Sequence, residues 1–128
     1  MSLMDVANEL VAGCREVREG ANLDKLYAQD AVSVEAMAME ETGMGREAKG
    51  LDAIKGKHEW WNNSMEMLEG TISDPMPHGD DKFAAIFKMK AKEKASGSVM
   101  DMEEVGVYTV KDGKIIREEF FYAMDGGS

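Results

Sequence analysis

The sequence predicts a single α+β domain in which N-terminal helices precede a curved antiparallel sheet. Three observations support this prediction: the chain has 128 residues, helical spacing of apolar residues comes early, and alternating strands joined by short turns come late. A chain of this length suits one domain with one hydrophobic core. A long, twisted sheet that curls around amphipathic helices forms a cone with an open mouth. We therefore treat residues 1–128 as one cone-shaped domain.

Helical periodicity defines the N-terminal part of the chain. Within residues 3–19, apolar side chains recur every three or four positions and form one stripe. Gly20 is expected to end this helix, because glycine accepts the left-handed geometry of a helix cap. Asn22 is then expected to cap a short helix that ends at Tyr27.

A second strong helix is predicted for residues 51–63. Its apolar face carries Leu51, Ile54, His58 and Trp61. Residues 36–50, which contain three glycines and several charges, are expected to form a long loop or an irregular hairpin before it.

The strands are predicted from alternation and turn residues. They cover residues 31–35, 67–74, 82–94, 99–110 and 114–124. Short turns at 95–98 and 111–113 join the last three strands, so these are expected to form an antiparallel meander. The Asp112-Gly113 pair is a strong hairpin signal.

Composition and charge disfavour several classes of partner. The chain has 25 Asp and Glu residues against 15 Lys and Arg residues, which gives a net charge of −10. An acidic chain repels nucleic acids and anionic membranes, so neither is expected as a partner. Cys14 is the only cysteine, so no internal disulfide forms and a cytoplasmic location is expected. Two histidines and one cysteine without ligand-like spacing predict no metal site.

Three motifs resemble elements of one protein family. Residues 26–35 (LYAQDAVSVE) resemble the LYADDAVFVDP element of SnoaL-like and ketosteroid-isomerase-like proteins. Residues 50–54 (GLDAI) resemble their G-x-x-A-I helix start, and residues 107–116 (VYTVKDGKII) resemble their final hairpin. The motifs occur in the family's order and span most of the chain. The resemblance implies the nuclear transport factor 2-like fold, a cystatin-like α+β barrel.

The resemblance also implies an assembly and a range of functions. It implies a homodimer packed through the outer face of the sheet, with one pocket per subunit and no obligatory cofactor. The fold carries isomerases, cyclases, dehydratases, hydrolases and non-catalytic binding domains, so the fold alone does not choose among them.

Glu35 is the first candidate catalytic residue. Ketosteroid-isomerase-like enzymes use a carboxylate base at the end of the first strand, and alignment from Tyr27 without gaps puts Glu35 there. Such a base removes a proton from the carbon next to a carbonyl group. Alternation offers a competing interpretation, because Val32 and Val34 lie on the face opposite Glu35. If these valines face the core, Glu35 faces solvent.

The last two strands carry most of the other candidates. If Val110 pairs with Ile116 across the turn, alternation gathers one set of side chains on a face that lines the family's cavity. This face carries Met102, Glu104, Gly106, Tyr108, Val110, Ile116, Glu118, Phe120 and Tyr122. Tyr108 then lies beside Glu118. A shift of one residue would exchange this face with that of Glu103, Arg117 and Glu119, which is interpreted as a salt-bridged outer or dimer face.

These strands give one catalytic and five ligand-binding candidates. Glu118 is the catalytic candidate, and the ligand-binding candidates are Met102, Glu104, Tyr108, Phe120 and Tyr122. Buried carboxylates need hydrogen bonds, which the tyrosines offer either structurally or together with a ligand. The isomerases' second acid falls on Gly106, so steroid-type isomerisation by the same machinery is not expected.

The second helix adds His58 and Trp61. His58 titrates near neutral pH and is a candidate acid or base, although a lone histidine on an apolar face is more often a hydrogen-bonded core residue. Trp61 is expected to point inward and contribute to ligand binding, while Trp60 covers the mouth or the dimer seam.

Two hypotheses for function follow. The first is a proton-transfer enzyme of the isomerase, cyclase or lyase type, which acts on an apolar carbonyl compound without a cofactor. Glu35 is its base, and His58, Tyr108 or Glu118 orients the carbonyl group or moves the proton. The second is a non-catalytic ligand-binding or dimerisation module that uses the same cavity. Pocket carboxylates with perturbed pKa values would favour the first.

Overall fold

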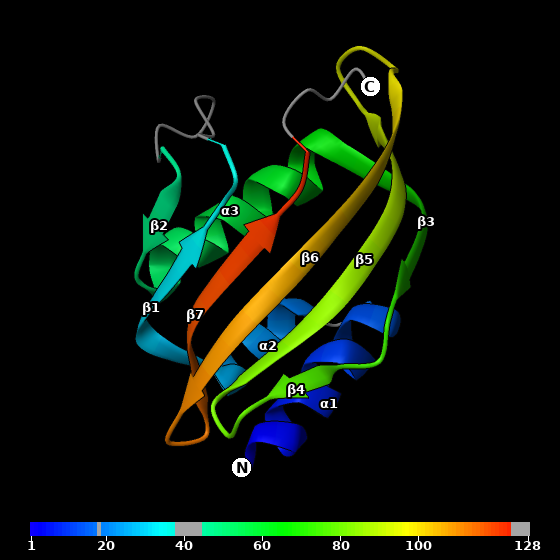
Figure 1. The fold of residues 1–128 in the computed structure, drawn as a ribbon. Coiled ribbons are helices and arrows are strands. Elements are labelled where there is room, and N and C mark those ends of the chain that lie inside the picture. Colours follow the sequence, from blue (N-terminus) through cyan, green and yellow to red (C-terminus); the bar gives the residue numbers. More distant parts are fainter. Residues whose placement is uncertain (18, 38–44, 124–128) are drawn as a thin grey trace.

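Three helices lie against one face of a seven-stranded sheet. The computed structural model describes residues 1–17, 19–37 and 45–123. The helices are α1 (Leu3–Arg15), α2 (Glu19–Leu26) and α3 (Leu51–Ser64). The strands are β1 (Tyr27–Val34), β2 (Glu47–Lys49), β3 (Met65–Ile72), β4 (Met76–His78), β5 (Lys82–Glu93), β6 (Val99–Lys111) and β7 (Lys114–Phe121). The predicted α+β architecture, with a curved sheet around helices, is confirmed (Figure 1).

The sheet has the order β2-β1-β7-β6-β5-β3, and β4 pairs with β5. Its neighbours are antiparallel except β1 and β7, which are parallel. The sheet is therefore mixed. The predicted meander of the last three strands is confirmed, and β2 with β1 forms part of the hairpin expected within residues 36–50. Residues 38–44 of that segment and Met124 of the last predicted strand lie outside the described residues.

The first two predicted helices are both present, but the boundary between them lies earlier than predicted. α1 begins with a capping box, in which the Ser2 hydroxyl and the Asp5 carboxylate each accept a backbone N–H from the other residue. It ends at Arg15, and Val17 has a left-handed φ of 57°. Gly20 lies inside α2 rather than at the end of α1. The expectation for Gly20 was therefore wrong.

Asn22 packs α2 against α1 instead of capping a helix. Its side chain is buried, and the amide donates a hydrogen bond of 3.1 Å to the carbonyl oxygen of Glu9. Gly13 of α1 makes this approach possible, since a Cβ atom there would lie 2.1 Å from the Asn22 amide nitrogen. The polar residue that resembled a cap thus satisfies a carbonyl group of the neighbouring helix.

The final hairpin has the predicted pairing along most of its length. Tyr108 is opposite Glu118, and Asp112 and Gly113 both have positive φ angles, as an Asp-Gly turn requires. An irregularity between Thr109 and Val110 shifts the register next to the turn, so Val110 pairs with Ile115. The fully buried residue is therefore Ile115 rather than Ile116, because the extra residue changes which side chain faces inward.

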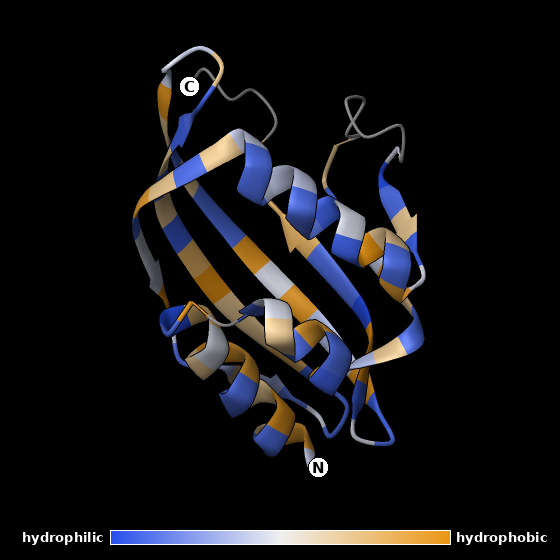
Figure 2. Ribbon diagram, turned by 180° about the vertical axis from the view of Figure 1, so that it is seen from behind, coloured by the Kyte–Doolittle hydropathy of each residue, from blue (hydrophilic) through white to orange (hydrophobic). Residues whose placement is uncertain are grey.

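The hydrophobic core lies between the helices and the concave face of the sheet. Figure 2 shows α1 and α2 across one half of this face and α3 across the other. The largest fully buried apolar residues are Phe83, Leu26, Leu51, Ile54 and Ile115. Leu51 and Ile54 bring the first turns of α3 into this core, whereas Lys57, one turn later, is a buried polar residue.

Candidate functional site

Eight polar side chains form a cluster on the inner side of the sheet, which we call the inner polar cluster. Its members come from β1 and the residue after it, from α3 and β6, and from β7 and the residue after it: Tyr27, Ser33, Glu35, Lys57, Glu104, Tyr108, Glu118 and Tyr122. Helix α3 and strands β6 and β7 bring together residues that are far apart in the sequence. Five of the eight were candidates from the sequence, and Tyr27, Ser33 and Lys57 were not.

Glu35 faces this cluster. The Oε2 atom of Glu35 lies 2.5 Å from Lys57 Nζ, and the Oε1 atom accepts a hydrogen bond of 3.0 Å from the Tyr122 hydroxyl. Only 14% of the Glu35 side chain is exposed. Ser33 is fully buried and lies on the inward face of β1. Side chains two residues apart along a strand point to the same face, so Glu35 points inward as well. The interpretation that Glu35 faces solvent is therefore wrong.

Lys57 supplies a positive charge that the sequence analysis missed. Its side chain is 10% exposed, and Nζ donates to Ser33 Oγ at 2.6 Å as well as to Glu35. The ammonium group lies 5.3 Å from the centre of the Phe120 ring, within cation–π range. Burying a lysine is costly unless it is paired and hydrogen-bonded, and here it is both. We expected His58 to be the polar residue that points inward from this helix. Lys57, one residue earlier, points inward instead.

Glu104 differs from Glu35 because it has no hydrogen-bond partner among the described residues. It lies on the inner face of β6, opposite Phe87 of β5, and is partly buried. Burial raises the pKa of Glu104 to about 7, and the negative charges of Glu35 and Glu118 add to this effect while Lys57 opposes it. A carboxyl group with this pKa is partly protonated at neutral pH, so it has the protonation behaviour of a general acid or base.

Glu118 is the most deeply buried carboxylate of the cluster, with 1% of the residue exposed. Its Oε1 atom accepts a hydrogen bond from the Tyr27 hydroxyl, whereas Oε2 has no partner among the residues that the structure describes. Burial and the charge of Glu118 raise the pKa of Tyr27 well above its usual value, so this hydroxyl stays protonated and remains a donor. One oxygen of a buried carboxylate is thus left without the hydrogen bond that burial requires.

Tyr108 is the cross-strand neighbour of Glu118. Its ring stacks on Phe83 with a centroid distance of 4.8 Å and meets the edge of Phe120 at 6.2 Å. The hydroxyl lies over Gly106, where an added Cβ atom would be 3.1 Å from it. Burial raises the pKa of Tyr108 well above its usual value, with Glu118 as the next cause. The Tyr108 hydroxyl is therefore a protonated donor, and it has no hydrogen-bond partner among the described residues.

The remaining predicted residues surround the cluster. Phe120 packs against Tyr108 and Phe87. Met102 is partly buried and lines a shallow groove across β3, β5 and β6 that includes no member of the inner polar cluster. His58 is partly buried, and no hydrogen bond or ion pair between it and the cluster occurs within the described part of the chain.

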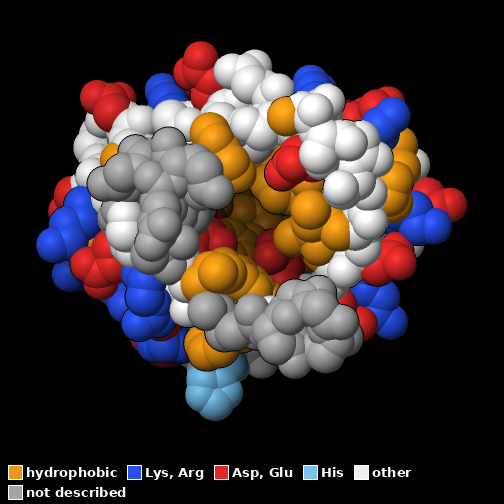
Figure 3. Space-filling model, turned by 90° about the horizontal axis from the view of Figure 1, so that it is seen from above, with side chains coloured by type: hydrophobic (Ala, Val, Ile, Leu, Met, Phe, Trp, Pro, Cys, Tyr) orange, Lys and Arg blue, Asp and Glu red, His pale blue; other side chains and the backbone are white. Residues whose placement is uncertain are grey.

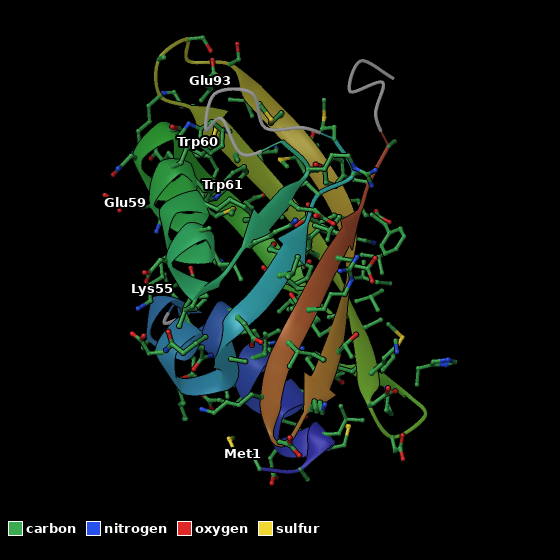
Figure 4. All side chains as sticks on the ribbon, turned by 90° about the vertical axis from the view of Figure 1, so that its left-hand side faces the viewer. Met1, Lys55, Glu59, Trp60, Trp61 and Glu93 are labelled. Atoms are coloured by element: carbon green, nitrogen blue, oxygen red, sulfur yellow. The ribbon has the colours of Figure 1, made fainter. Side chains whose placement is uncertain are left out.

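The two tryptophans lie near the open end of the molecule. Figure 4 shows Trp60 and Trp61 on the last turns of α3, close to Glu93 at the end of β5, whereas Lys55 and Glu59 project away from the sheet. Both tryptophans are partly buried.

The open end of the cone is hollow. Figure 3, viewed from this end, shows a depression with hydrophobic side chains around it and acidic side chains inside it. Among the described residues, no group of three or more His, Cys, Asp or Glu side chains has the arrangement of a metal site. The chemistry that the interior offers is therefore that of carboxylates, phenols and one ammonium group against aromatic walls.

Fold and site together define a class of protein: cone-shaped α+β domains with polar groups inside an apolar cone. A family model for the SnoaL-like domain matches residues 1–122, so the chain belongs to the SnoaL-like family. The resemblance found in the sequence is confirmed by this match. No match to the chain is found among curated proteins.

Solved structures support the same assignment. The chain is 33% identical to a candidate SnoaL-like polyketide cyclase from Mesorhizobium loti, with a TM-score of 0.85 over 95% of this chain and 100% of the other. A candidate isomerase from Bacillus subtilis has 17% identity and a TM-score of 0.74, over 95% of this chain and 86% of the other. A protein with a cystatin-like fold from Xanthomonas campestris has 16% identity and a TM-score of 0.75, over 97% and 92%. The latter two similarities are evidence for the fold alone.

In the part of the chain that the structure describes, no helix is long and apolar enough to cross a membrane. The absence of a cofactor, the repulsion of nucleic acids and the cytoplasmic location stay predictions from the sequence.

Proposed function

We propose that the interior of the cone binds an apolar small molecule with a carbonyl group, and that Glu35 transfers a proton at the carbon next to this group. The supporting observation is the inward position of the Glu35 carboxylate, within the electrostatic reach of Glu104. Apolar walls with a few convergent polar groups are typical of small-molecule sites.

The two carboxyl groups divide the proton transfer between them. Glu35 is the base, and its charged hydrogen bonds from Lys57 and Tyr122 fix the orientation of the carboxylate. A carboxylate has about four lone-pair positions, so the two bonds leave room for a substrate proton. Glu104 carries a proton in part of the molecules at neutral pH and donates a hydrogen bond to the carbonyl oxygen as negative charge develops there. Carboxyl groups in contrasting environments are a common way to divide acid and base roles.

Deuterium exchange tests this function. Acetylnaphthalene, an apolar ketone with exchangeable methyl protons, is incubated with the protein in heavy water and followed by NMR. The wild type should accelerate exchange, and Glu35→Gln should reduce the acceleration at least about 100-fold, since a general base contributes about that much. Glu47→Gln, on exposed β2, is the control. Equal rates for wild type and Glu35→Gln would exclude Glu35 as the base.

The second candidate function is ligand binding without catalysis. One observation favours it: both oxygen atoms of Glu35 are occupied, Oε2 by Lys57 and Oε1 by Tyr122. In that case, the ketone binds and no exchange above the background rate is measured, with either the wild type or Glu35→Gln.

A homodimer through the outer face of the sheet is the proposed assembly. It is supported by an apolar row across three strands, in which Ile86, Val105 and Phe121 are aligned in register. Phe121 is 55% exposed in the single chain. Sedimentation velocity should show a dimer for the wild type, and Phe121→Ser should shift it toward the monomer. A monomeric wild type would contradict the proposal.

A further inference from the structure

Glu118 and Tyr108 present two complementary, unsatisfied groups to the interior of the cone. Within the described residues, the Oε2 atom of Glu118 is a buried acceptor without a partner. The Tyr108 hydroxyl is a donor without a partner among the described residues. The two residues are directly opposite each other on β6 and β7, so their side chains lie on the same face.

The described neighbours of Glu118 and Tyr108 do not satisfy these two groups. Tyr27 already bonds the other oxygen of Glu118, and its hydroxyl has only one proton to donate. The Tyr108 ring is fixed by stacking on Phe83 and by the edge of Phe120. A buried acceptor without a donor is destabilising, so the fold maintains a group that an added partner would stabilise.

The chemistry of the pair selects among possible partners. An ammonium group only donates hydrogen bonds, and a ketone or ether oxygen only accepts them. A hydroxyl group does both, so, unlike these groups, it can donate to Glu118 Oε2 and accept from Tyr108 with one atom.

We propose that Glu118 and Tyr108 recognise a hydroxyl group on the ligand, so that the preferred substrate is an apolar compound with a hydroxyl group at one end and the reacting carbonyl group at the other. The carbonyl part rests on the proposed function, whereas the hydroxyl part rests on the two unpartnered groups. Gly106 contributes to the site, because any larger residue would push against the Tyr108 ring and hydroxyl.

The test compares three ligands that differ at one position. Acetylnaphthalene is used without a substituent, with a hydroxyl group, and with a methoxyl group at the ring position farthest from the acetyl group. Affinities are measured by isothermal titration calorimetry, which does not depend on catalysis. The wild type should bind the hydroxyl ketone about tenfold or more tightly than the other two, as a hydrogen bond to a charged group allows.

Two variants assign the preference to the pair. Tyr108→Phe should reduce the preference for the hydroxyl ketone several-fold. Glu118→Gln keeps a bond to Tyr27 and can turn its amide group toward the ligand, so it should favour the methoxyl ketone over the unsubstituted one. Glu119→Gln, the next residue on β7 and on the outer face, should bind all three ligands like the wild type. Circular dichroism checks that each variant is folded.

The outcomes separate this inference from the proposed function. Equal affinities of the wild type for the three ketones, unchanged preferences in both variants, or no binding of the hydroxyl ketone at its solubility limit would overturn the inference. Hydroxyl preference without deuterium exchange would support the inference and overturn the proposed catalysis. Deuterium exchange without hydroxyl preference would support the proposed catalysis and overturn the inference.

Discussion

Two parts of the inner polar cluster satisfy their polar groups in opposite ways. The paired group, formed by Ser33, Glu35, Lys57 and Tyr122, is connected by hydrogen bonds and one ion pair. The unpaired group is formed by Glu104, Tyr108 and Glu118, and each of its members has an oxygen without a hydrogen-bond partner among the described residues. The difference teaches that the paired group fixes the position of Glu35, the proposed base, whereas the unpaired group leaves oxygen atoms free to bond a ligand.

The largest expected effect comes from breaking the paired group. Lys57→Met leaves Glu35 buried without its cation and Ser33 without its bond, so unfolding free energy should fall by about 3–5 kcal/mol. Urea denaturation measures this change. Lys55→Met is the matched control: its ion pair with Asp24 has a similar length of 2.6 Å, but the two side chains are 40% and 69% exposed. It should cost less than about 1 kcal/mol. Similar losses in both variants would contradict the comparison.

Next in size is the effect of removing the charge of Glu104. The pKa of Glu104 is about 7 in the folded chain, against 4.5 for the unperturbed group. Because the folded pKa is raised, the folded state binds more protons between these values, and stability from this group is present below pH 4.5 and lost as pH rises through 7. Glu104→Gln should thus be more stable than the wild type above neutral pH by up to about 3 kcal/mol, and the difference should vanish in acid. Urea midpoints across the pH range test this, with exposed Glu103→Gln as the control.

Deuterium exchange should follow the same titration. If the acid form of Glu104 assists the carbonyl oxygen, the exchange rate per enzyme falls as pH rises through about 7. In Glu104→Gln, whose amide is neutral at every pH, this fall should be absent. A fall with the same midpoint in both proteins would assign the titration to another group.

The smallest effects separate a partnered tyrosine from an unpartnered one. Tyr27→Phe removes the only side-chain hydrogen bond that Glu118 makes within the described part of the chain, and should cost about 1–2 kcal/mol. Tyr108→Phe removes a hydroxyl without a partner, so its stability should stay within about 0.5 kcal/mol of the wild type. Thermal unfolding of both variants measures the contrast. A larger loss in Tyr108→Phe than in Tyr27→Phe would show that Tyr108 has a structural partner.

The fold was largely predictable because it depends on local patterns. The strands from Lys82 onward alternate clearly and are joined by turns with Gly or Asp-Gly, so the limits next to these turns and the Tyr108–Glu118 register follow from the sequence. No turn signal marks the end of the last strand, which ends at Phe121 and not at residue 124 as predicted. The irregularity that buries Ile115 instead of Ile116 leaves no such signal, because one extra residue changes neither composition nor turn type. The prediction that Asn22 caps a helix was wrong for a similar reason: the sequence does not show that its hydrogen-bond partner is a carbonyl group of another helix.

The candidate site was predictable on the strands and not on the helix. Alternation and the family motif placed Glu104, Tyr108 and Glu118 together. Lys57 and His58 lie three and four residues after Ile54, so helical spacing places both near the inward face. Because lysine is rarely buried, the sequence pattern favoured His58 as the inward residue. Its burial depends on Glu35, which is far away in the sequence and comes close only in the folded chain.

The parallel pairing of β1 with β7 has a consequence for biosynthesis. β1 can join the rest of the sheet only after β7 has been made, since β7 lies between β1 and β6. Until residue 121 has left the ribosome, β1 and β6 both have unpaired edges, and a growing chain cannot complete either the cone or the inner polar cluster. Folding of this domain is thus expected to follow the synthesis of β7. Chains truncated before β7 should expose the unpaired edges of β1 and β6 and should therefore aggregate.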